Sequence, residues 1–112
     1  MIHNMNLNNE PFELIKNGSK TIELRLNDEK RRLLNVGDEI LFTNRDTNEK
    51  LLTDIIELHK YDSFESLYKN FDKVSLGYRE YEKSDPSDMN NYYSKEDEMK
   101  YGVVGIELRL KK

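Results

Sequence analysis

The sequence of 112 residues has no cysteine and only two histidines. Without cysteine, the chain cannot form disulfides, zinc ribbons or a thiol nucleophile. The histidines, His3 and His59, lie far apart in the sequence, and neither has a carboxylate at a metal-ligand spacing. We therefore expect no metal site and no bound cofactor.

Long apolar runs and glycine-rich loops are also missing. No run approaches the roughly 20 apolar residues that a membrane-spanning helix needs, and we find no secretory signal. The five glycines form neither of the phosphate-binding patterns GxGxxG and GxxxxGKS. We expect a cytoplasmic protein that makes no use of a membrane, with one domain over residues 1–112.

The charge balance restricts the class of partner. The chain has 18 basic and 22 acidic residues and a net charge of −4, whereas binding to long nucleic acid usually requires a broad basic face. The segment from Lys16 to Arg32 differs, because it holds six basic and three acidic residues. Its local positive field suits a small anionic ligand or a few nucleotides.

Hydrophobic periodicity predicts an α+β domain of five strands and three short helices. The predicted strands cover residues 1–7, 21–26, 39–43, 51–58 and 103–110. The predicted helices follow residues 8, 63 and 94, and residues 77–91 read as a long surface loop. Because the strands are mostly adjacent in sequence, we expect hairpins and a mixed or antiparallel sheet that curls into a small β-barrel.

The strand over residues 21–26 alternates strictly between apolar and polar side chains. This places Glu23 and Arg25 on the face away from the core, about 7 Å apart, with Lys20 at the start of the strand. Arginine suits a phosphate or a base edge, and glutamate suits an amino or hydroxyl group, so this face is a candidate ligand site. The alternative is a solvated strand face with an ordinary ion pair.

A second candidate site lies at the start of the last predicted helix. Ser94 and Glu98 are four residues apart and share a helical face, next to Tyr93. A ring, a hydroxyl and a carboxylate can together stack on a base and hydrogen-bond to it. The simpler alternative is that Ser94 caps the helix and that the acidic residues interact with the helix dipole.

Taken together, these residues resemble the ASCH domain family, a branch of the PUA-like superfamily. The resemblance covers most of the chain and rests on three blocks in the order of the family: residues 12–26, 36–42 and 93–106. The first contains the pattern G-x-K-T-x-E-x-R and the second contains G-D-x-I-x-F.

The resemblance implies a PUA-like β-barrel with a cleft at its side that binds RNA or nucleotides. The expected partner is a short single-stranded RNA, a nucleotide or a nucleoside. The implied cleft residues are Lys20, Glu23 and Arg25 from the barrel, facing Tyr93, Ser94 and Glu98. Arg31 and Arg32 extend the positive track in this hypothesis.

Two alternatives stay open. One branch of the family resembles a small amidohydrolase that removes acyl groups from N4-acylated cytidines, and other members are described as ribonucleases. Lys20 and Glu98 match the lysine and glutamate of the amidohydrolase, but Glu23 stands where that branch has a threonine, and a carboxylate does not replace a hydroxyl nucleophile. A hydrolase would use Lys20, Glu23 and Glu98 in acid–base chemistry. A protein-interaction adaptor would instead use residues 77–91.

Overall fold

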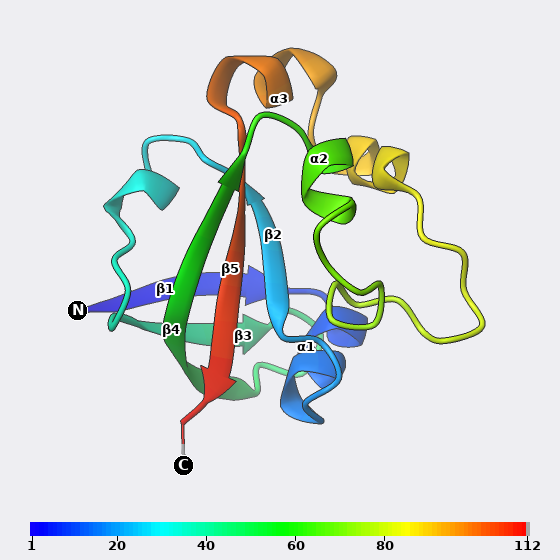
Figure 1. Cartoon of the computed structure of the whole chain (residues 1–112). Helices are drawn as coiled ribbons and strands as arrows, with labels where there is room; N and C mark the ends of the chain where they lie inside the picture. The colour runs from blue at the N-terminus through cyan, green and yellow to red at the C-terminus, as the bar shows by residue number, and fades with distance from the viewer. Residues whose placement is uncertain (112) are drawn as a thin grey trace.

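The computed structural model describes residues 1–111 and contains one five-stranded sheet with short helices around it (Figure 1). The strands are β1 (Ile2–Leu7), β2 (Ile22–Leu26), β3 (Glu39–Asn44), β4 (Lys50–Tyr61) and β5 (Val103–Leu110). The helices are α1 (Asn9–Lys16), α2 (Phe64–Tyr68) and α3 (Lys95–Tyr101), with the 3-10 helices η1 (Arg31–Leu33) and η2 (Pro86–Asn91). The predicted strands and their approximate bounds are confirmed.

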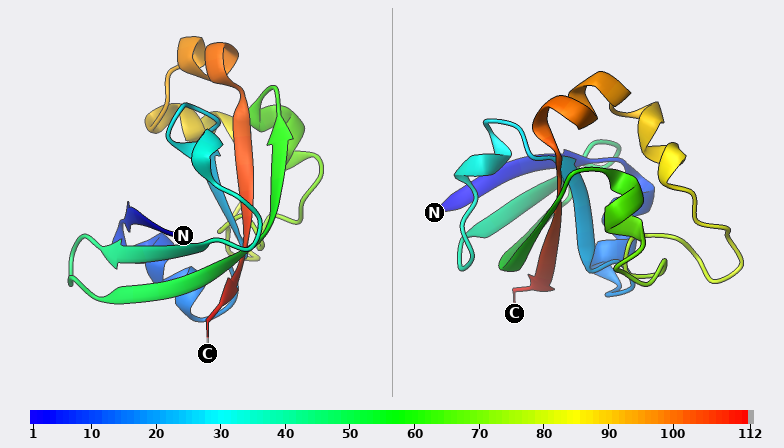
Figure 2. Two further views of the ribbon diagram at one scale, coloured as in Figure 1. Left: turned by 90° about the vertical axis from the view of Figure 1, so that its left-hand side faces the viewer. Right: turned by 45° about the horizontal axis from the view of Figure 1, so that its top comes forward.

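The strands follow the order β1-β3-β4-β5-β2, so that β1 and β2 form the two edges of the sheet. β1 runs parallel to β3, and the other neighbours are antiparallel. The sheet curls into a half-barrel, which confirms the predicted α+β, PUA-like barrel class (Figure 2). The expectation that hairpins dominate is wrong: β3 and β4 form a hairpin, whereas the other three pairs join strands separated by helices.

The long strand β4 produces much of the curl. Its first half pairs with β3, and its second half pairs with β5, where the register shifts between Ile55 and Glu57. Such a bulge bends the strand and increases its twist. β4 therefore belongs to both halves of the curled sheet.

Two groups of buried apolar side chains hold the helices against the sheet. The first lies between β1, β3, β4, β5 and helix α1, and consists of Met5, Leu7, Phe12, Ile15, Leu34, Ile40, Phe42, Ile55, Val104, Ile106 and Leu108. The second lies under α2 and consists of Ile22, Leu24, Leu26, Phe64, Leu67, Leu76 and Val103. β5 contributes to both groups and so links the two halves of the core.

The helices begin where the sequence predicts. The Ser63 hydroxyl accepts a hydrogen bond from the Ser66 amide at the start of α2, and the Ser94 hydroxyl does the same for the Asp97 amide at the start of α3. Helix α2 ends at Tyr68, one turn earlier than the apolar spacing indicates. Residues 77–91 are an irregular segment as predicted, except that its last six residues form η2. Within residues 1–111, no helix combines the length and the apolar composition that a membrane crossing requires.

Candidate functional site

The polar face of β2 points toward the inside of the half-barrel. β2 pairs with β5 so that Glu23 lies opposite Ile106 and Arg25 lies opposite Val104. Directly opposed side chains stand on the same face of a sheet, and both β5 residues belong to the first core group. The predicted alternation is confirmed, but this face is not solvated: Glu23 is only 4% exposed.

Glu23 is held between two cations. One carboxylate oxygen lies 3.1 Å from Lys20 Nζ, and the other lies 2.8 Å from Arg25 Nη2 and also accepts a hydrogen bond from Arg25 Nε. Lys20 is 8% exposed, and its ammonium group also donates to the backbone carbonyl of Leu76. A buried charge is tolerated only when it is paired and hydrogen-bonded, so these three side chains stabilise one another.

The two cations also fix the charge of the carboxylate. Burial alone would raise the pKa of Glu23, but the positive charges of Lys20 and Arg25 outweigh it and hold this pKa below its usual value. Burial alone would lower the pKa of Arg25, and the Glu23 charge raises it instead. Glu23 is therefore ionised near neutral pH and is a weak proton acceptor.

Arg25 also connects the two edges of the sheet. Its Nη2 atom donates a hydrogen bond of 3.1 Å to the backbone carbonyl oxygen of Asn6 on β1. Tyr93 lies beside it, with its ring stacked on Phe64 at a centroid distance of 5.9 Å. Burial raises the pKa of the Tyr93 hydroxyl, and the charges of Arg25 and Arg31 lower it in part. This hydroxyl stays protonated and can donate a hydrogen bond.

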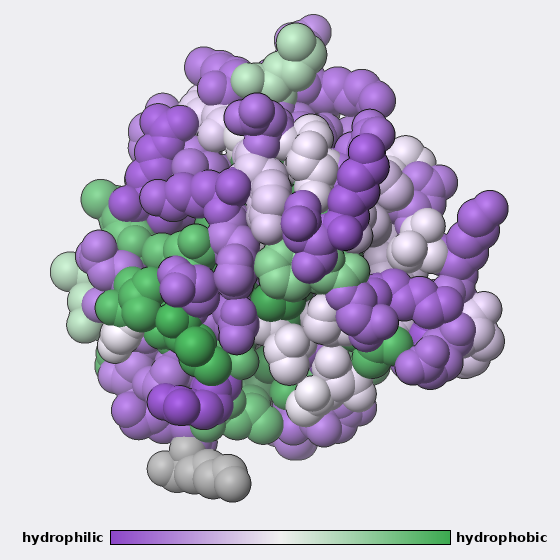
Figure 3. Space-filling view, viewed as in Figure 1, coloured by the Kyte–Doolittle hydropathy of each residue, from purple (hydrophilic) through white to green (hydrophobic). Residues whose placement is uncertain are grey.

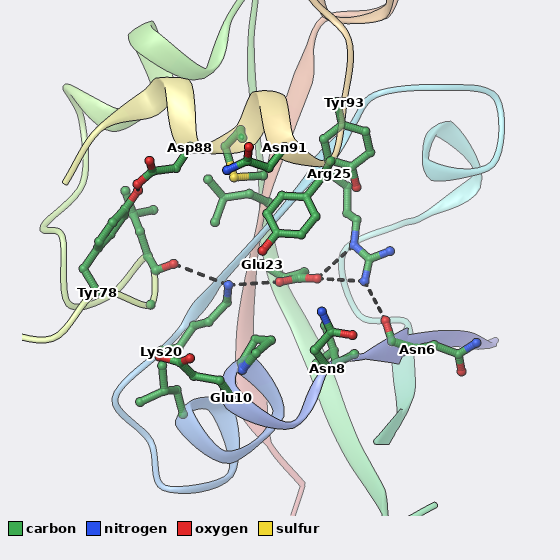
Figure 4. Close-up of a pocket in the computed structure, with 18 of the residues that line it drawn as sticks. Asn6, Asn8, Glu10, Lys20, Glu23, Arg25, Tyr78, Asp88, Asn91 and Tyr93 are labelled. Carbon is green, nitrogen blue, oxygen red and sulfur yellow. Dashed lines mark hydrogen bonds and ion pairs between the residues drawn. The ribbon is translucent and has the colours of Figure 1, made fainter. Parts of the chain in front are cut away.

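A pocket of about 800 Å³ opens over these side chains. Figure 4 shows Arg25 and Tyr93 on one side, Tyr78 and Asp88 on the other, and Glu23 between them. Its charged lining residues are the cations Lys20, Arg25, Arg31 and Arg45 and the acids Glu10, Glu23, Glu82 and Asp88. The lining therefore carries no net formal charge.

Three guanidinium groups lie on the β1 and β2 side of this pocket. Besides Arg25, they belong to Arg31, which pairs with Asp28 at 3.1 Å, and to Arg45, which donates to the Asn8 side chain. Each of these interactions uses only part of the five donors of a guanidinium group. The remaining donors can receive an anion.

The opposite side is built by the irregular segment after α2. The Tyr78 hydroxyl donates a hydrogen bond of 2.7 Å to the Asp88 carboxylate, and it lies 3.0 Å from the Tyr68 hydroxyl. Burial and these two hydrogen bonds raise the pKa of Tyr78. The network fixes residues 77–91 against α2, and it presents a carboxylate and phenol rings to the pocket.

Gly77 supports Lys20 by leaving room for it. Its φ is +108°, and a Cβ atom there would lie 3.0 Å from Lys20 Cδ and 3.3 Å from Lys20 Nζ. Any other residue at this position would be strained in its backbone and would press on the lysine. The segment that lines one side of the pocket therefore also positions its buried ammonium group.

Three predicted site residues lie elsewhere. Ser94 and Glu98 do not line this pocket: Ser94 caps α3, and Glu98 Oε2 accepts a hydrogen bond of 2.8 Å from the backbone amide of Phe64 at the start of α2. Arg32 points to the ring of Tyr101 rather than into the pocket. The hydrolase hypothesis requires Lys20, Glu23 and Glu98 in one site, and the fold does not bring them together.

Several residues that line the pocket carry no clear signal in the sequence. Arg45 lies in a turn that reads as a polar hairpin loop, and Tyr78 and Asp88 lie in a segment with little periodicity. The tyrosines of this segment were the one available signal, since an exposed loop rarely needs them. No three or more histidine, aspartate or glutamate side chains within residues 1–111 form a group that could hold a metal ion.

Comparison with known families decides the assignment. The model of the ASCH domain matches residues 5–112, nearly the whole chain. The chain belongs to the ASCH domain family. This family is generally thought to bind RNA, and the half-barrel sheet with short helices matches its fold. A search of curated proteins found no match.

Solved structures of similar proteins cover the full length of this ASCH domain. The hypothetical protein PH0355 is 32% identical, with a TM-score of 0.84 over 99% of this chain and 100% of its own. Protein PF0455 from Pyrococcus furiosus is 35% identical, with a TM-score of 0.74 over 100% and 99% of the two chains. ASCH from Zymomonas mobilis, at 14% identity, has a TM-score of 0.70 over 96% of this chain and 66% of its own, which supports the fold alone.

Proposed function

We propose that this ASCH domain binds short single-stranded RNA by taking one nucleotide into the pocket between β1, β2 and the segment 77–91. The observation that carries the proposal is a cavity of about 800 Å³ whose lining combines three arginine side chains with tyrosine rings and the Asp88 carboxylate. Sites for small ligands usually measure about 300–1,000 Å³, which includes a nucleotide. A nucleotide has an anionic end and a neutral, hydrogen-bonding base, and the pocket has a complementary side for each.

The phosphate belongs on the arginine side. Arg25, Arg31 and Arg45 offer planar donor groups there, and guanidinium groups bind phosphate oxygens with two parallel hydrogen bonds. The Tyr93 hydroxyl adds a neutral donor. Glu23 holds Arg25 in place. Its two oxygens are already paired with Lys20 and Arg25, so they do not contact the phosphate of the ligand.

The base belongs on the opposite side, near Tyr78 and Asp88. Phenol rings give a surface on which a base can stack, and a carboxylate accepts hydrogen bonds from exocyclic amino groups. The net charge of −4 is compatible with this mode, because the pocket engages one phosphate rather than a long row of phosphates. No observation favours the hydrolase or the adaptor over this function.

Calorimetric titration with a nucleoside and with the matching nucleoside monophosphate tests the proposal. We expect the monophosphate to bind at least about ten times more tightly, since hydrogen bonds to charged groups contribute about 1.5–3 kcal/mol. Arg31→Ala with Arg45→Ala should remove this difference, while Lys50→Ala with Lys69→Ala, an equal change of charge outside the pocket, should not. Equal affinities for the two ligands would contradict the arrangement, and no binding at near-millimolar concentration would contradict the pocket.

A backbone amide NMR titration with a short single-stranded RNA locates the binding site on the structure. Chemical shift changes are expected over residues 20–25, 77–93 and the turn before α1. They should be small at Glu98. Changes confined to other surfaces would contradict binding in the pocket.

A further inference from the structure

Within residues 1–111, about half of the lysine and arginine side chains pair with an acid, and the others do not. The cations with an acidic partner within 4.0 Å are Lys16, Lys20, Arg25, Arg31, Lys69, Arg79, Arg109 and Lys111. Nine basic side chains within residues 1–111 form no ion pair with an acid, and three of these, Arg32, Lys60 and Lys100, are exposed near helix α3. These three lie around one feature of the surface.

That feature is a groove of about 480 Å³ between the end of β4 and helix α3. Lys60 and Lys100 line it, together with the ring of Tyr101 and one acid, Asp62. In the view of Figure 3, the end of the molecule that carries α3 is mostly hydrophilic, whereas hydrophobic side chains gather lower on the same face. The groove therefore lies in a polar region and has an excess of positive charge.

Tyr101 holds two of the cations in place. The Arg32 guanidinium carbon lies 6.0 Å from the centroid of its ring, and Lys100 Nζ lies 5.0 Å from it. These distances are within the range of a cation–π interaction, which orients a cation without neutralising its charge. Arg32 and Lys100 are thus positioned by an aromatic ring and stay able to bind an anion.

The helix η1 connects this groove with the nucleotide pocket. Arg31 lines the pocket, and Arg32, the next residue, reaches Tyr101 beside the groove. Adjacent Cα atoms lie about 3.8 Å apart, so one of two neighbouring side chains lines the pocket and the other reaches the Tyr101 ring at the groove. A chain of phosphates that leaves the pocket past Arg31 meets Arg32 next.

We propose that Arg32, Lys60 and Lys100 form a second contact surface, which binds the phosphodiester backbone of a single RNA strand as it continues out of the pocket. This inference rests on the proposed function, since it extends the ligand of the same pocket from one nucleotide to several. The pocket selects the nucleotide, and the second surface adds affinity that depends on strand length. Only an oligonucleotide reaches both.

The salt dependence of RNA affinity distinguishes the contribution of the second contact surface from that of the pocket. The probe is an oligoribonucleotide of about eight nucleotides, within the range of site sizes of small single-strand-binding domains. We expect Arg32→Ala with Lys100→Ala to lower its affinity by about tenfold or more. The slope of log K against log salt should become shallower by about 1.4, because each lost phosphate contact removes about 0.7 for a single strand. The affinity for a nucleoside monophosphate should not change.

Lys50→Ala with Lys69→Ala is the matched control, since it removes two exposed positive charges that line neither hollow. An equal change of slope in this control would show a general charge effect and would overturn the inference. An unchanged slope in the Arg32 and Lys100 variant would also overturn it. A nucleoside monophosphate that fails to bind the unaltered protein would instead contradict the pocket alone, so the two failures are distinguishable.

Discussion

Arg25 and Asn6 join the two edges of the sheet by one hydrogen bond, from the guanidinium Nη2 atom to the backbone carbonyl oxygen, at 3.1 Å. β1 and β2 are otherwise the unpaired ends of the strand order β1-β3-β4-β5-β2. The same guanidinium group binds Glu23 and faces the pocket. A single side chain thus closes the half-barrel and contributes to the site, and its two roles can be separated by experiment.

Replacing Arg25 should destabilise the fold. Arg25→Met leaves the buried Glu23 with Lys20 alone, and removal of one partner of a buried ion pair lowers the free energy of unfolding by about 3–5 kcal/mol. Adding Glu23→Gln should recover part of this loss, with a coupling energy of about 0.5–3 kcal/mol in a double-mutant cycle. Urea denaturation measures both. Arg109→Met is the control, because Arg109 lies 4.0 Å from Asp54 and its side chain is mostly exposed. Additive effects of Arg25→Met and Glu23→Gln would contradict the coupling.

The contribution of Glu23 should depend on pH in one direction. Its pKa is lowered in the folded protein, whereas an unfolded glutamate titrates near 4.3. The ionised carboxylate therefore adds stability above about pH 5, and this stability is lost as the pH falls through the lower folded pKa. The difference in unfolding free energy between the protein and Glu23→Gln should be largest near neutral pH and should shrink below about pH 4. A difference that grows in acid would contradict the arrangement.

Gly77→Ala should displace Lys20. It introduces backbone strain at a φ of +108° and a Cβ atom 3.0 Å from the lysine side chain. Gly18→Ala is a matched control, because Gly18 has a φ of +89° and open space around its Cβ position. We expect Gly77→Ala to be less stable than the control by about 1–3 kcal/mol, the usual effect of overpacking, and to weaken binding of a nucleoside monophosphate. Equal effects of the two changes on stability and on binding would show that the contact with Lys20 is unimportant.

Glu98 should act on stability and not on binding. Glu98→Ala removes the acceptor for the Phe64 amide at the start of α2, and loss of such a helix cap lowers the free energy of unfolding by about 0.5–2 kcal/mol. Glu96→Ala, in the same first turn of α3 but exposed, should change it by less. Thermal unfolding measures the effect on stability, and titration with a nucleoside monophosphate measures the effect on binding. Weaker binding in the Glu98 variant would restore this residue to the ligand site.

The local pattern placed the charged side chains at the centre of the site on one face of β2. Successive side chains of a strand alternate between its two faces, so the sequence of β2 was enough to place Glu23 and Arg25 together, with Lys20 nearby. It could not tell that this face is buried, because burial depends on Ile106 and Val104, more than 75 residues away on β5. The same local rule placed Ser94 and Glu98 on one face of α3, but it does not say what that face meets.

The long-range pairings could not be read from the sequence. Short connections favour hairpins, yet β1 pairs with β3 beyond α1 and β2, and β2 pairs with β5 at the other end of the chain. These pairings bring Arg45 and the segment 77–91 to the pocket. Their side chains carry no periodic signal, because an irregular segment is held by specific hydrogen bonds, such as that of Tyr78 with Asp88, rather than by an apolar face.

The position of β5 in the sheet determines when the site can form. β5 is the last strand in the sequence, but it lies between β4 and β2 and connects β2 to the rest of the sheet. Within residues 1–111, none of the side chains that line the pocket comes from β5. During synthesis, β2, which carries Glu23 and Arg25, therefore has no strand to pair with until β5 has been made. A chain cut before β5 would contain every residue that lines the pocket but no strand that joins β2 to the rest of the sheet.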